Sequence, residues 1–384
     1  MLNIPIMINK ELILRKKAGW MKRIYHRAPL LYSLLIRNAN CQKELKKIDN
    51  SGFYGRLTEE EKILVQKLWG KLRPDWRWFS FYNSIARGDA KKFDSRFVPL
   101  DVQYCLIDNY FNNVGECWAM DDKNMYDLYF YDVRMPKTIV HVVAGQCMDN
   151  KYQMISIEEA VRLCVCQKNV IIKPSYAQGA GCDIVFWSIE DGETELKNQL
   201  KHGENVVVQE LIVQHPNLRI LHHNSVNTIR IMTCFFEGVT NVLSAVVRIG
   251  AGDSKIDNAS QGGLFCGLTD DGHLKKYAYD KTGQTFTQTP DGLAYDQCFV
   301  PNYDKCKELV LRLSNRFLRI SKLTSWDLSI GEDGEPILVE VNLCNSGADI
   351  LQIANGPLYG EKTKQIVGKA MQSKVYPYYQ RVVR

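Results

Sequence analysis

The sequence lacks a long hydrophobic run. Its longest apolar stretch is about nine residues, 28–36, between Arg27 and Arg37, whereas a membrane-spanning helix needs about 20 apolar residues. Residues 1–17 also lack an apolar core followed by small residues, which is the pattern of a secretory signal. The sequence therefore predicts neither a transmembrane segment nor a signal peptide.

Paired cysteine motifs are missing as well. The twelve cysteines are scattered from Cys41 to Cys344, and no two CxxC pairs give the spacing of a structural zinc site. The closest pair, Cys164 and Cys166, lies in an apolar helical stretch. We therefore expect buried, reduced thiols and a cytoplasmic protein.

The body of the chain has no large excess of one charge. Residues 1–50 hold 11 Lys and Arg against 3 Asp and Glu, and the other 334 residues hold 38 basic and 40 acidic side chains. A nucleic-acid partner is therefore not expected. The basic segment, 1–50, interleaves its charges with aliphatic and aromatic residues, which leaves two interpretations. It is a packed helical cap with a solvated basic face, or it contacts an anionic membrane at the inner face.

Repeats, low-complexity tracts and long linkers are also absent. With 384 residues and 45% hydrophobic residues, the chain is long enough for two or three packed units. The first third is typical of helices, and Thr58 with Glu61 forms a capping box. Strands and helices alternate from residue 121 onward. Strands are expected at 170–173, 206–209, 227–236, 242–249, 326–330 and 337–341, and helices at 157–166 and 303–320.

The first candidate for chemistry is the stretch 171–181, which does not contain the GxxxxGK[ST] phosphate loop. Lys173 ends a predicted strand, and a loop with Ser175, Gly179 and Gly181 follows. A lysine and free backbone N–H groups at such a place suit a polyphosphate. The alternative is a simply solvated lysine before a turn.

The second candidate is a hairpin of strands 326–330 and 337–342. Folding about Asp333 and Gly334 sets Asp327 opposite Glu340, and strand alternation puts Asn342 on the same face as Glu340. Facing carboxylates repel each other, and Mg²⁺ prefers an all-oxygen shell of this kind. The hairpin therefore predicts a metal site, against the alternative of an exposed edge with scattered acids.

The third candidate is the arginine pair Arg230 and Arg248. A hairpin loop centred on Val239 places the two opposite each other, although a shift of one residue would break this register. Two arginines in apolar strands suit an anion, such as a transferring phosphoryl group or an oxyanion. Two separate ion pairs remain the alternative. The polar turn 257–263 is expected to close over the same site.

Together these residues resemble the ATP-grasp superfamily, from about residue 121 to 347. Asp327, Glu340 and Asn342 reproduce the spacing of its metal hairpin, and Asp122-Lys123 looks like its "DK" pair. The resemblance implies that Lys123 and Lys173 are the nucleotide lysines. It also implies that the stretch 206–212 is the nucleotide hinge, with binding residues Gln209, Glu210, Leu211 and Ile212.

The finer pattern is similar to the sugar-transfer-associated branch, which is related to α-L-glutamate ligases. The stretches that carry this likeness are 73–78, 97–100, 225–230 and 257–263. Two departures are visible: the phosphate loop has fewer glycines than in many relatives, and the usual Asn-x-x-Pro-Gly after the metal hairpin is replaced by the sequence of residues 342–347. The second departure bears on the shape of the acceptor pocket.

The resemblance implies an α+β architecture with the ATP-grasp fold. Two α/β subdomains then clamp the nucleotide, and a helical N-terminal region precedes them. The expected divisions are a basic helical region (1–95), a linking region (96–137), a small lid subdomain (138–205) and a large subdomain with the metal site (206–384).

The implied activity is that of an ATP- and Mg²⁺-dependent carboxylate–amine ligase that works through an acyl phosphate, with Arg248 or Arg230 stabilising the oxyanion. The expected partners are an amino acid or another amine and a small-molecule or glycan-precursor carboxylate, such as a uronic-acid sugar, which points to polysaccharide biosynthesis. Two alternatives stay open. The same nucleotide clamp serves a kinase that phosphorylates a sugar or another hydroxyl, and a nucleotide-binding scaffold needs no turnover.

Overall fold

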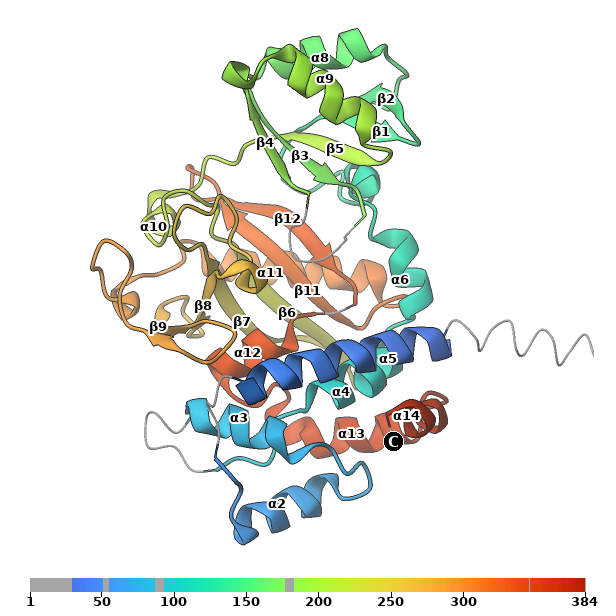
Figure 1. The fold of residues 1–384 in the computed structure, drawn as a ribbon, viewed down its shortest axis with the longest axis vertical. Helices are drawn as coiled ribbons and strands as arrows, with labels where there is room; N and C mark the ends of the chain where they lie inside the picture. The colour runs from blue at the N-terminus through green and yellow to red at the C-terminus, as the bar shows by residue number, and fades with distance from the viewer. Residues whose placement is uncertain (1–29, 51–54, 87–92, 177–182, 345, 384) are drawn as a thin grey trace, which may run out of the picture.

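The computed structural model describes residues 30–50, 55–86, 93–176, 183–344 and 346–383. Two antiparallel sheets and a layer of helices are stacked along the long axis of the molecule (Figure 1). The mixed architecture expected from the sequence is therefore confirmed.

The smaller sheet has the strand order β2-β1-β5-β3-β4. Its strands are β1 (Thr138–Val143), β2 (Gln146–Asp149), β3 (Asn169–Pro174), β4 (Val185–Ser188) and β5 (Val206–Glu210). Two helices, α8 (Ile157–Val165) and α9 (Glu193–His202), cover one face. The Ser156 hydroxyl caps α8 by accepting a hydrogen bond from the Glu159 N–H, as the sequence predicts.

The expected division at residue 205 falls just before a strand of this smaller sheet. β5 pairs with both β1 and β3, so the sheet continues to Glu210. The apolar run 206–208 is compatible with the interior of either sheet. Only the hydrogen bonding of β5 to its neighbouring strands shows to which sheet it belongs. The division of the chain into domains stays a prediction.

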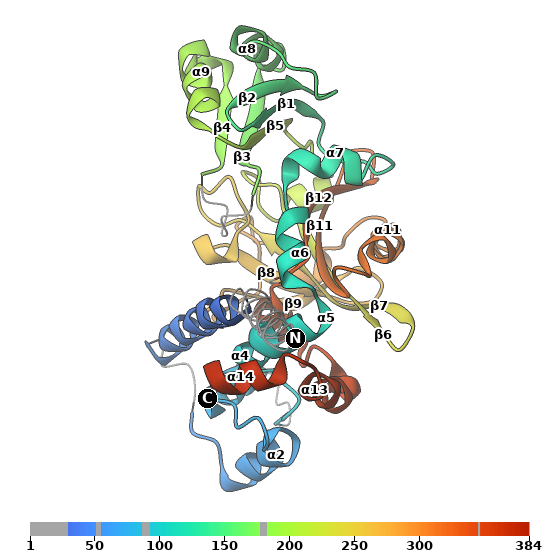
Figure 2. The ribbon, with the colours of Figure 1, turned by 90° about the vertical axis from the view of Figure 1, so that its right-hand side faces the viewer.

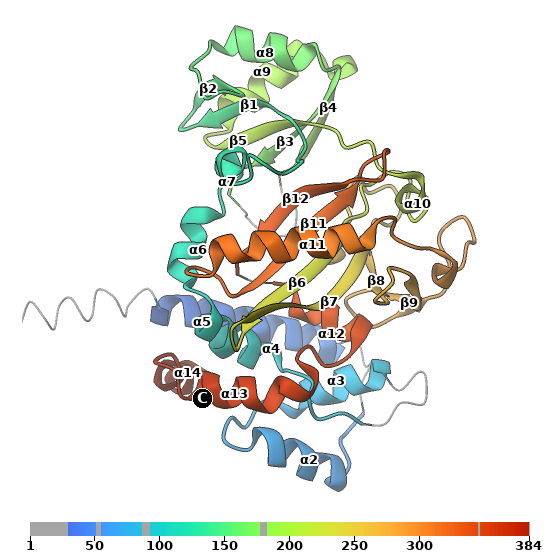
Figure 3. The same ribbon diagram turned by 180° about the vertical axis from the view of Figure 1, so that it is seen from behind.

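The larger sheet has the order β10-β9-β8-β7-β6-β11-β12. Its strands are β6 (Ile229–Phe236), β7 (Val239–Ile249), β8 (Leu264–Leu268), β9 (Leu274–Tyr279), β10 (Thr285–Phe286), β11 (Leu323–Ile330) and β12 (Pro336–Asn342). The helix α11 (Tyr303–Ser314) lies across its back (Figure 3). Trp326 and Leu328 of β11 pack with this helix. Because side chains alternate along a strand, Asp327 points to the opposite face.

A helical layer packs against that opposite face and combines an early and a late part of the described chain (Figure 2). Its early part contains a helix over residues 30–50, then α2 (Glu59–Trp69), α3 (Trp76–Ala86), α4 (Leu100–Val102) and α5 (Asp108–Phe111). Its late part contains α12 (Ala348–Asn355), α13 (Thr363–Met371) and α14 (Tyr376–Val382). Thr58 and Glu61 form the expected capping box of α2. Three further short helices are α6 (Val114–Met120), α7 (Tyr126–Tyr129) and α10 (Pro216–Arg219).

One buried glutamine ties the early and late parts of this layer together. The side chain of Gln352 in α12 accepts a hydrogen bond from the Val98 N–H (2.7 Å) and donates one to the Val98 carbonyl (2.9 Å). Both backbone groups are buried, so their pairing avoids a desolvation cost of about 1–3 kcal/mol each.

Two further expectations concern cysteines and membranes. The eleven cysteines in the described ranges are free thiols, and nine of them are buried. None of the helices in the described ranges combines the length and apolarity that a membrane crossing needs. Residues 1–29 of the basic segment lie outside the described residues.

Candidate active site

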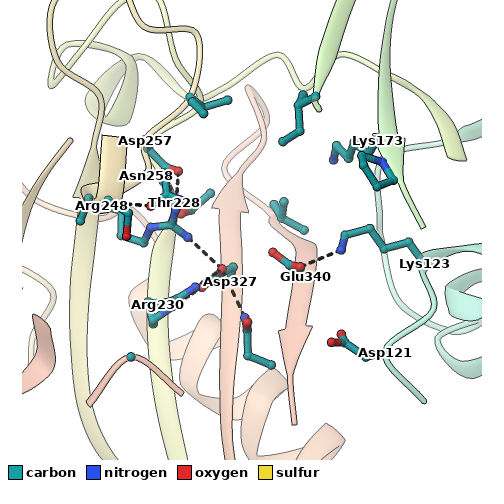
Figure 4. Close-up of a pocket in the computed structure, with 18 of the residues that line it drawn as sticks. Asp121, Lys123, Lys173, Thr228, Arg230, Arg248, Asp257, Asn258, Asp327 and Glu340 are labelled. Atoms are coloured by element: carbon teal, nitrogen blue, oxygen red, sulfur yellow. Dashed lines mark hydrogen bonds and ion pairs between the residues drawn. The ribbon is translucent and has the colours of Figure 1, made fainter. Parts of the chain in front are cut away.

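A cleft of about 2070 Å³ lies between the two sheets. Its walls are the uncovered face of the smaller sheet, the β11–β12 hairpin and part of the helical layer. Lys173, Arg230, Asp327, Glu340 and Asn342 all line it. Side chains that the sequence identified separately therefore meet in one place (Figure 4).

The hairpin brings Asp327 opposite Glu340, as predicted. Its turn is centred on Asp333 and not between Asp333 and Gly334, since Ile330 pairs with Pro336 and the five residues between them form the loop. A bulge then adds one residue to β12, between the partners of Asp327 and Leu328. The two deviations compensate each other, which is why the predicted opposition of the carboxylates holds.

The predicted pairing of Arg230 with Arg248 is wrong. Arg230 lies opposite Val246. The turn consists of Glu237 and Gly238, both with positive φ, which is the two-residue hairpin turn favoured by strand twist. A second bulge, at Met232, shifts the register again. Turn and bulge together move the strands by two residues relative to the prediction.

Both arginines nevertheless converge on one carboxylate. Arg230 donates from Nε to Oδ1 of Asp327 (2.8 Å) and from Nη2 to Oδ2 (2.6 Å). Arg248 donates from Nη1 to Oδ2 (3.0 Å). Burial disfavours the charge on Asp327, but the two guanidinium groups outweigh burial and lower its pKa. Asp327 is thus ionised inside the protein, and each arginine strand is tied to β11.

Lys123 forms the second ion pair of the site, with Glu340 (2.8 Å). Burial opposes the charge of Glu340, and Lys123 more than offsets this, so the pKa of Glu340 is lowered. Asp121 lies beside this pair and also lines the cleft. Burial raises the pKa of Asp121 to about 7, although Lys123 acts against the shift. Lys123 therefore has three acids near it in this part of the cleft: Glu340, Asp121 and Asp327.

Lys173 lines the cleft from the smaller sheet. Val170 and Ile172 point into the core under α8 and α9, so alternation turns Lys173 to the free face. Its ammonium donates to Oε1 of Gln209 (3.2 Å) and has no carboxylate partner within the described ranges. Burial, together with the nearby charge of Lys123, lowers the pKa of Lys173 to about 8. A partly buried cation without a carboxylate partner in the described part of the chain is a suitable place for an anion.

The other predicted nucleotide residues fall into three groups. Glu210, Leu211 and Ile212 line the cleft, and the Glu210 carboxylate accepts a hydrogen bond from the Lys137 N–H (3.1 Å). Gln209 and Ser175 are buried and do not line it. Gln209 accepts from Lys173 and donates to the Pro136 carbonyl (3.4 Å), and the Ser175 hydroxyl is buried. Gly179 and Gly181 lie outside the described residues.

The donor set of the hairpin fits a divalent cation bound together with phosphate. No cluster of three or more His, Cys, Asp and Glu side chains is arranged around a metal in the described part of the chain. The predicted ligands are two carboxylates and one amide, and phosphate oxygens complete the shell of Mg²⁺ in many nucleotide sites. Asn342 donates weakly to Oδ2 of Asp327 (3.5 Å), which leaves its amide oxygen for a cation.

Two residues of the site, Asp257 and Asp121, were missed by the sequence analysis as individual candidates. Asp257 pairs with Nη2 of Arg248 (2.9 Å) and accepts a hydrogen bond from the Thr228 N–H (2.8 Å). The turn 257–263 was expected to close over the site. The ion pair with Arg248 identifies Asp257 as a residue of this turn that reaches the site. Asp121 was overlooked beside the "DK" pair, although the doubled aspartate before Lys123 was a visible signal.

A family model described as "Sugar-transfer associated ATP-grasp" matches residues 107–367, more than half of the chain. The chain belongs to this ATP-grasp family. The match confirms the ATP-grasp fold and the branch expected from the sequence. It begins within the helical layer and ends in α13, so it includes every site residue described above.

Several solved structures are similar at low identity. The ATP-grasp ligase PsnB complexed with minimal precursor is 14% identical over 67% of this chain and 64% of that one, with a TM-score of 0.40. D-alanyl-alanine synthetase A from Vibrio cholerae is 13% identical over 70% and 66%, at 0.38. D-cycloserine synthetase DcsG is 13% identical over 88% and 96%, at 0.40. This chain spans less than two thirds of the PsnB chain, and no curated protein matches it.

The lowered pKa of Lys173 predicts a pH dependence for binding of a nucleotide in the cleft. The lysine is protonated below about pH 8 and loses its charge as the pH rises through that value. If bound phosphates keep it protonated, affinity falls about tenfold between pH 7 and 9. Calorimetry with Mg²⁺ and a non-hydrolysable ATP analogue measures this.

The variant Lys173→Arg keeps its charge at every pH, so its affinity is expected to be flat over the same range. Lys305→Arg is the matched control, because Lys305 is exposed and distant from the cleft, and it should retain the wild-type profile. A wild-type affinity that does not change between pH 7 and 9 would contradict the assignment of Lys173.

Proposed function

We propose that the protein is an ATP- and Mg²⁺-dependent carboxylate–amine ligase that forms an acyl phosphate and releases ADP. The observation that carries this proposal is the cleft in which Lys173, two arginines and the Asp327–Glu340–Asn342 set meet. Membership in an ATP-grasp family supports it.

Each group in the cleft has a role in this reaction. Lys173 and Lys123 hold the phosphates of ATP, and Glu210, Leu211 and Ile212 contact the adenosine. Asp327, Glu340 and Asn342 hold Mg²⁺, which neutralises charge on the phosphates when bound.

The chemistry requires two substitutions in sequence. An oxygen of the substrate carboxylate attacks the γ-phosphorus of ATP, the bond to the β-phosphate oxygen breaks, and ADP departs. The amine nitrogen then attacks the acyl carbon, phosphate leaves, and the nitrogen gives up a proton. Charge gathers on the acyl oxygen in the second step, and a fixed cation beside it stabilises that charge.

Arg248 is better placed for the acyl oxygen than Arg230. Two nitrogens of Arg230 are bound to the two oxygens of Asp327, in a bidentate pair that fixes the guanidinium. Arg248 divides its contacts between Asp327 and Asp257, and Asp257 belongs to the turn at the cleft wall. We assign Arg248 to the oxyanion and Arg230 to holding the metal hairpin.

The finer substrate and location are also proposals. The family description, sugar-transfer associated, supports a glycan-precursor acid such as a uronic-acid sugar. A cytoplasmic protein at the inner face of a membrane is supported by the excess of basic residues in 1–50. On the described part of that segment, Tyr32, Leu35 and Ile36 are exposed.

The acyl phosphate is tested by trapping. The protein, Mg²⁺ and ATP are incubated with a polar-metabolite extract and hydroxylamine, and ADP and hydroxamates are measured by mass spectrometry. A hydroxamate that appears together with ADP establishes the activated acid, and its mass identifies that acid. ADP with a phosphorylated product and no hydroxamate would instead establish the kinase.

Replacing Glu340 tests the metal hairpin. Glu340→Gln removes one proposed Mg²⁺ ligand and the partner of Lys123, so turnover is expected to fall by about 10² or more. Glu335→Gln is the matched control in the same hairpin, because the Glu335 side chain is half-buried and pairs only with Lys305 among the described residues. Turnover at the wild-type rate in a folded Glu340→Gln protein would remove Glu340 from the metal site.

Membrane contact is tested with full-length protein and vesicles of anionic phospholipid. Leu35→Ser combined with Ile36→Ser removes two exposed apolar side chains, so partitioning is expected to drop by about fivefold or more. The control pair is Ile63→Ser with Leu64→Ser, on the exposed face of α2. Equal partitioning of both double variants would leave residues 1–50 as a helical cap.

A further inference from the structure

His141 lies in the smaller sheet in register with one of the two lysines of the cleft. On β1 it pairs with Val207 of β5, and Lys173 of β3 pairs with Val207 from the other side. Directly paired residues point to the same face of a sheet, so the three side chains form a row across β1, β5 and β3. Val140 and Val142 point to the opposite face, into the core under α8 and α9. His141 and Lys173 therefore share the face that is turned toward the cleft.

The imidazole of His141 is completely buried, and the proposed reaction gives it no role. Its Nδ1 lies 2.9 Å from Oδ1 of Asn124. The amide nitrogen of Asn124 donates to the Val142 carbonyl (3.0 Å), which can only accept, so the amide oxygen is the atom that faces the ring. Nδ1 of His141 therefore carries a hydrogen and donates it. The other ring nitrogen, Nε2, lies 3.3 Å from Asp127 of α7 and makes no hydrogen bond within the described ranges.

Asn124 directly follows Lys123, and its four polar groups are all bound. Its N–H donates to Oδ1 of Asp122 (3.0 Å), and its carbonyl accepts from the Tyr152 hydroxyl (2.7 Å). The two side-chain contacts complete the set, and the residue is only 1% exposed. Buried polar groups keep their partners in folded proteins. The short helical turn Lys123–Met125 is therefore fixed at Asn124.

Tyr152 supports the imidazole as well as Asn124. The rings of Tyr152 and His141 are stacked, with centroids 4.4 Å apart and an angle of 16° between their planes. Tyr152 has a φ of 60°, which is rare for a bulky side chain and persists only where the surroundings hold it. The stacked pair thus binds Asn124 at two points, His141 at the side chain and Tyr152 at the backbone.

Lys123 transmits this arrangement to the cleft. Its N–H donates to the Ser175 carbonyl (2.8 Å), and its ammonium pairs with Glu340 (2.8 Å, Figure 4). Both contacts depend on the direction of the chain at Lys123, which Asn124 fixes. Without the hydrogen on Nδ1 of His141, the amide oxygen of Asn124 would be buried without a donor. Such a group is costly to keep in place, so the turn would shift until the oxygen regains a partner.

We propose that His141 is a positioning residue for nucleotide binding. By donating from Nδ1 to Asn124, it sets the place of Lys123 relative to Lys173, and so the spacing of the two ammonium groups that meet the phosphates. The proposal rests on the proposed function, in which these two lysines hold the phosphates of ATP. It adds a residue that does not itself line the cleft.

The test is calorimetry of full-length variants with Mg²⁺ and a non-hydrolysable ATP analogue. His141→Phe keeps a ring against Tyr152 but removes the donor. The turn then spends only part of its time in the binding arrangement, so the affinity is expected to fall about tenfold. His141→Asn places an amide N–H near the position of Nδ1 and should restore the affinity to within about threefold of the wild type. If His141→Phe does not fold, His141→Leu replaces it, because leucine has the shape of asparagine without its donor.

Val140→Ala is the matched control, because Val140 is buried in the same strand on the core face. It should lower the Tm and leave the affinity for the analogue unchanged. A second readout uses Lys123→Met. In that background, His141→Phe should cause no further loss of affinity, since the lysine that it positions is gone.

Wild-type affinity in a folded His141→Phe protein would overturn the proposal. Equal losses in His141→Phe and His141→Asn would overturn it too, because the donor would then not matter, and so would a further tenfold loss in the Lys123→Met background. Each of these results leaves the ligase function standing. Failure of the wild type to bind the analogue would instead overturn the ligase function.

Discussion

The burial of Asp327 is the constraint on which the site depends. Its side chain is only 1% exposed and faces Glu340 on the neighbouring strand. Two carboxylates so placed repel each other, and a buried charge is tolerated only with partners. The partners of Asp327 are Arg230 and Arg248, which come from β6 and β7. Their ion pairs with Asp327 therefore link three consecutive strands of the larger sheet. Removing one partner of such a pair typically costs about 3–5 kcal/mol.

The same requirement connects the two sheets. The Lys123 N–H donates to the carbonyl of Ser175 at the end of β3 (2.8 Å), while its ammonium reaches Glu340 on β12. Lys123 thus bonds to the smaller sheet through its backbone N–H and to the larger sheet through its side chain. Lys173 precedes Ser175 by two residues and has no carboxylate partner among the described residues. The carboxylates of the hairpin are thus paired with arginine and lysine side chains. The ammonium of Lys173 on the smaller sheet remains without a carboxylate among the described residues, and a polyphosphate would neutralise it.

Sequence reasoning about register succeeded in one hairpin and failed in the other. Asp327 lies opposite Glu340 as predicted, because the shifted turn and the bulge in β12 compensate each other. In the arginine hairpin, the turn at Glu237 and Gly238 moves Arg230 away from Arg248, and the bulge at Met232 reverses only part of that shift, so Arg230 lies opposite Val246. Ser175 was assigned to the nucleotide from its place in a loop, yet the backbone turns its hydroxyl inward. The sequence led us to expect the turn 257–263 over the site, but only the fold shows that Asp257 of this turn pairs with Arg248 of β7.

The contacts of the two arginines also determine which carboxylate oxygens remain available to bind a cation. Oδ2 of Asp327 already accepts from Arg230, Arg248 and, weakly, Asn342. Oδ1 accepts only from Nε of Arg230 in the described chain. A carboxylate oxygen offers about two lone-pair directions, so the remaining capacity lies on Oδ1 and on Glu340, which shares its charge with Lys123. The hairpin is therefore fixed by protein cations before any metal binds. The proposed Mg²⁺ would add to a site that already has its shape, and its binding energy would not be used to bring the two carboxylates together.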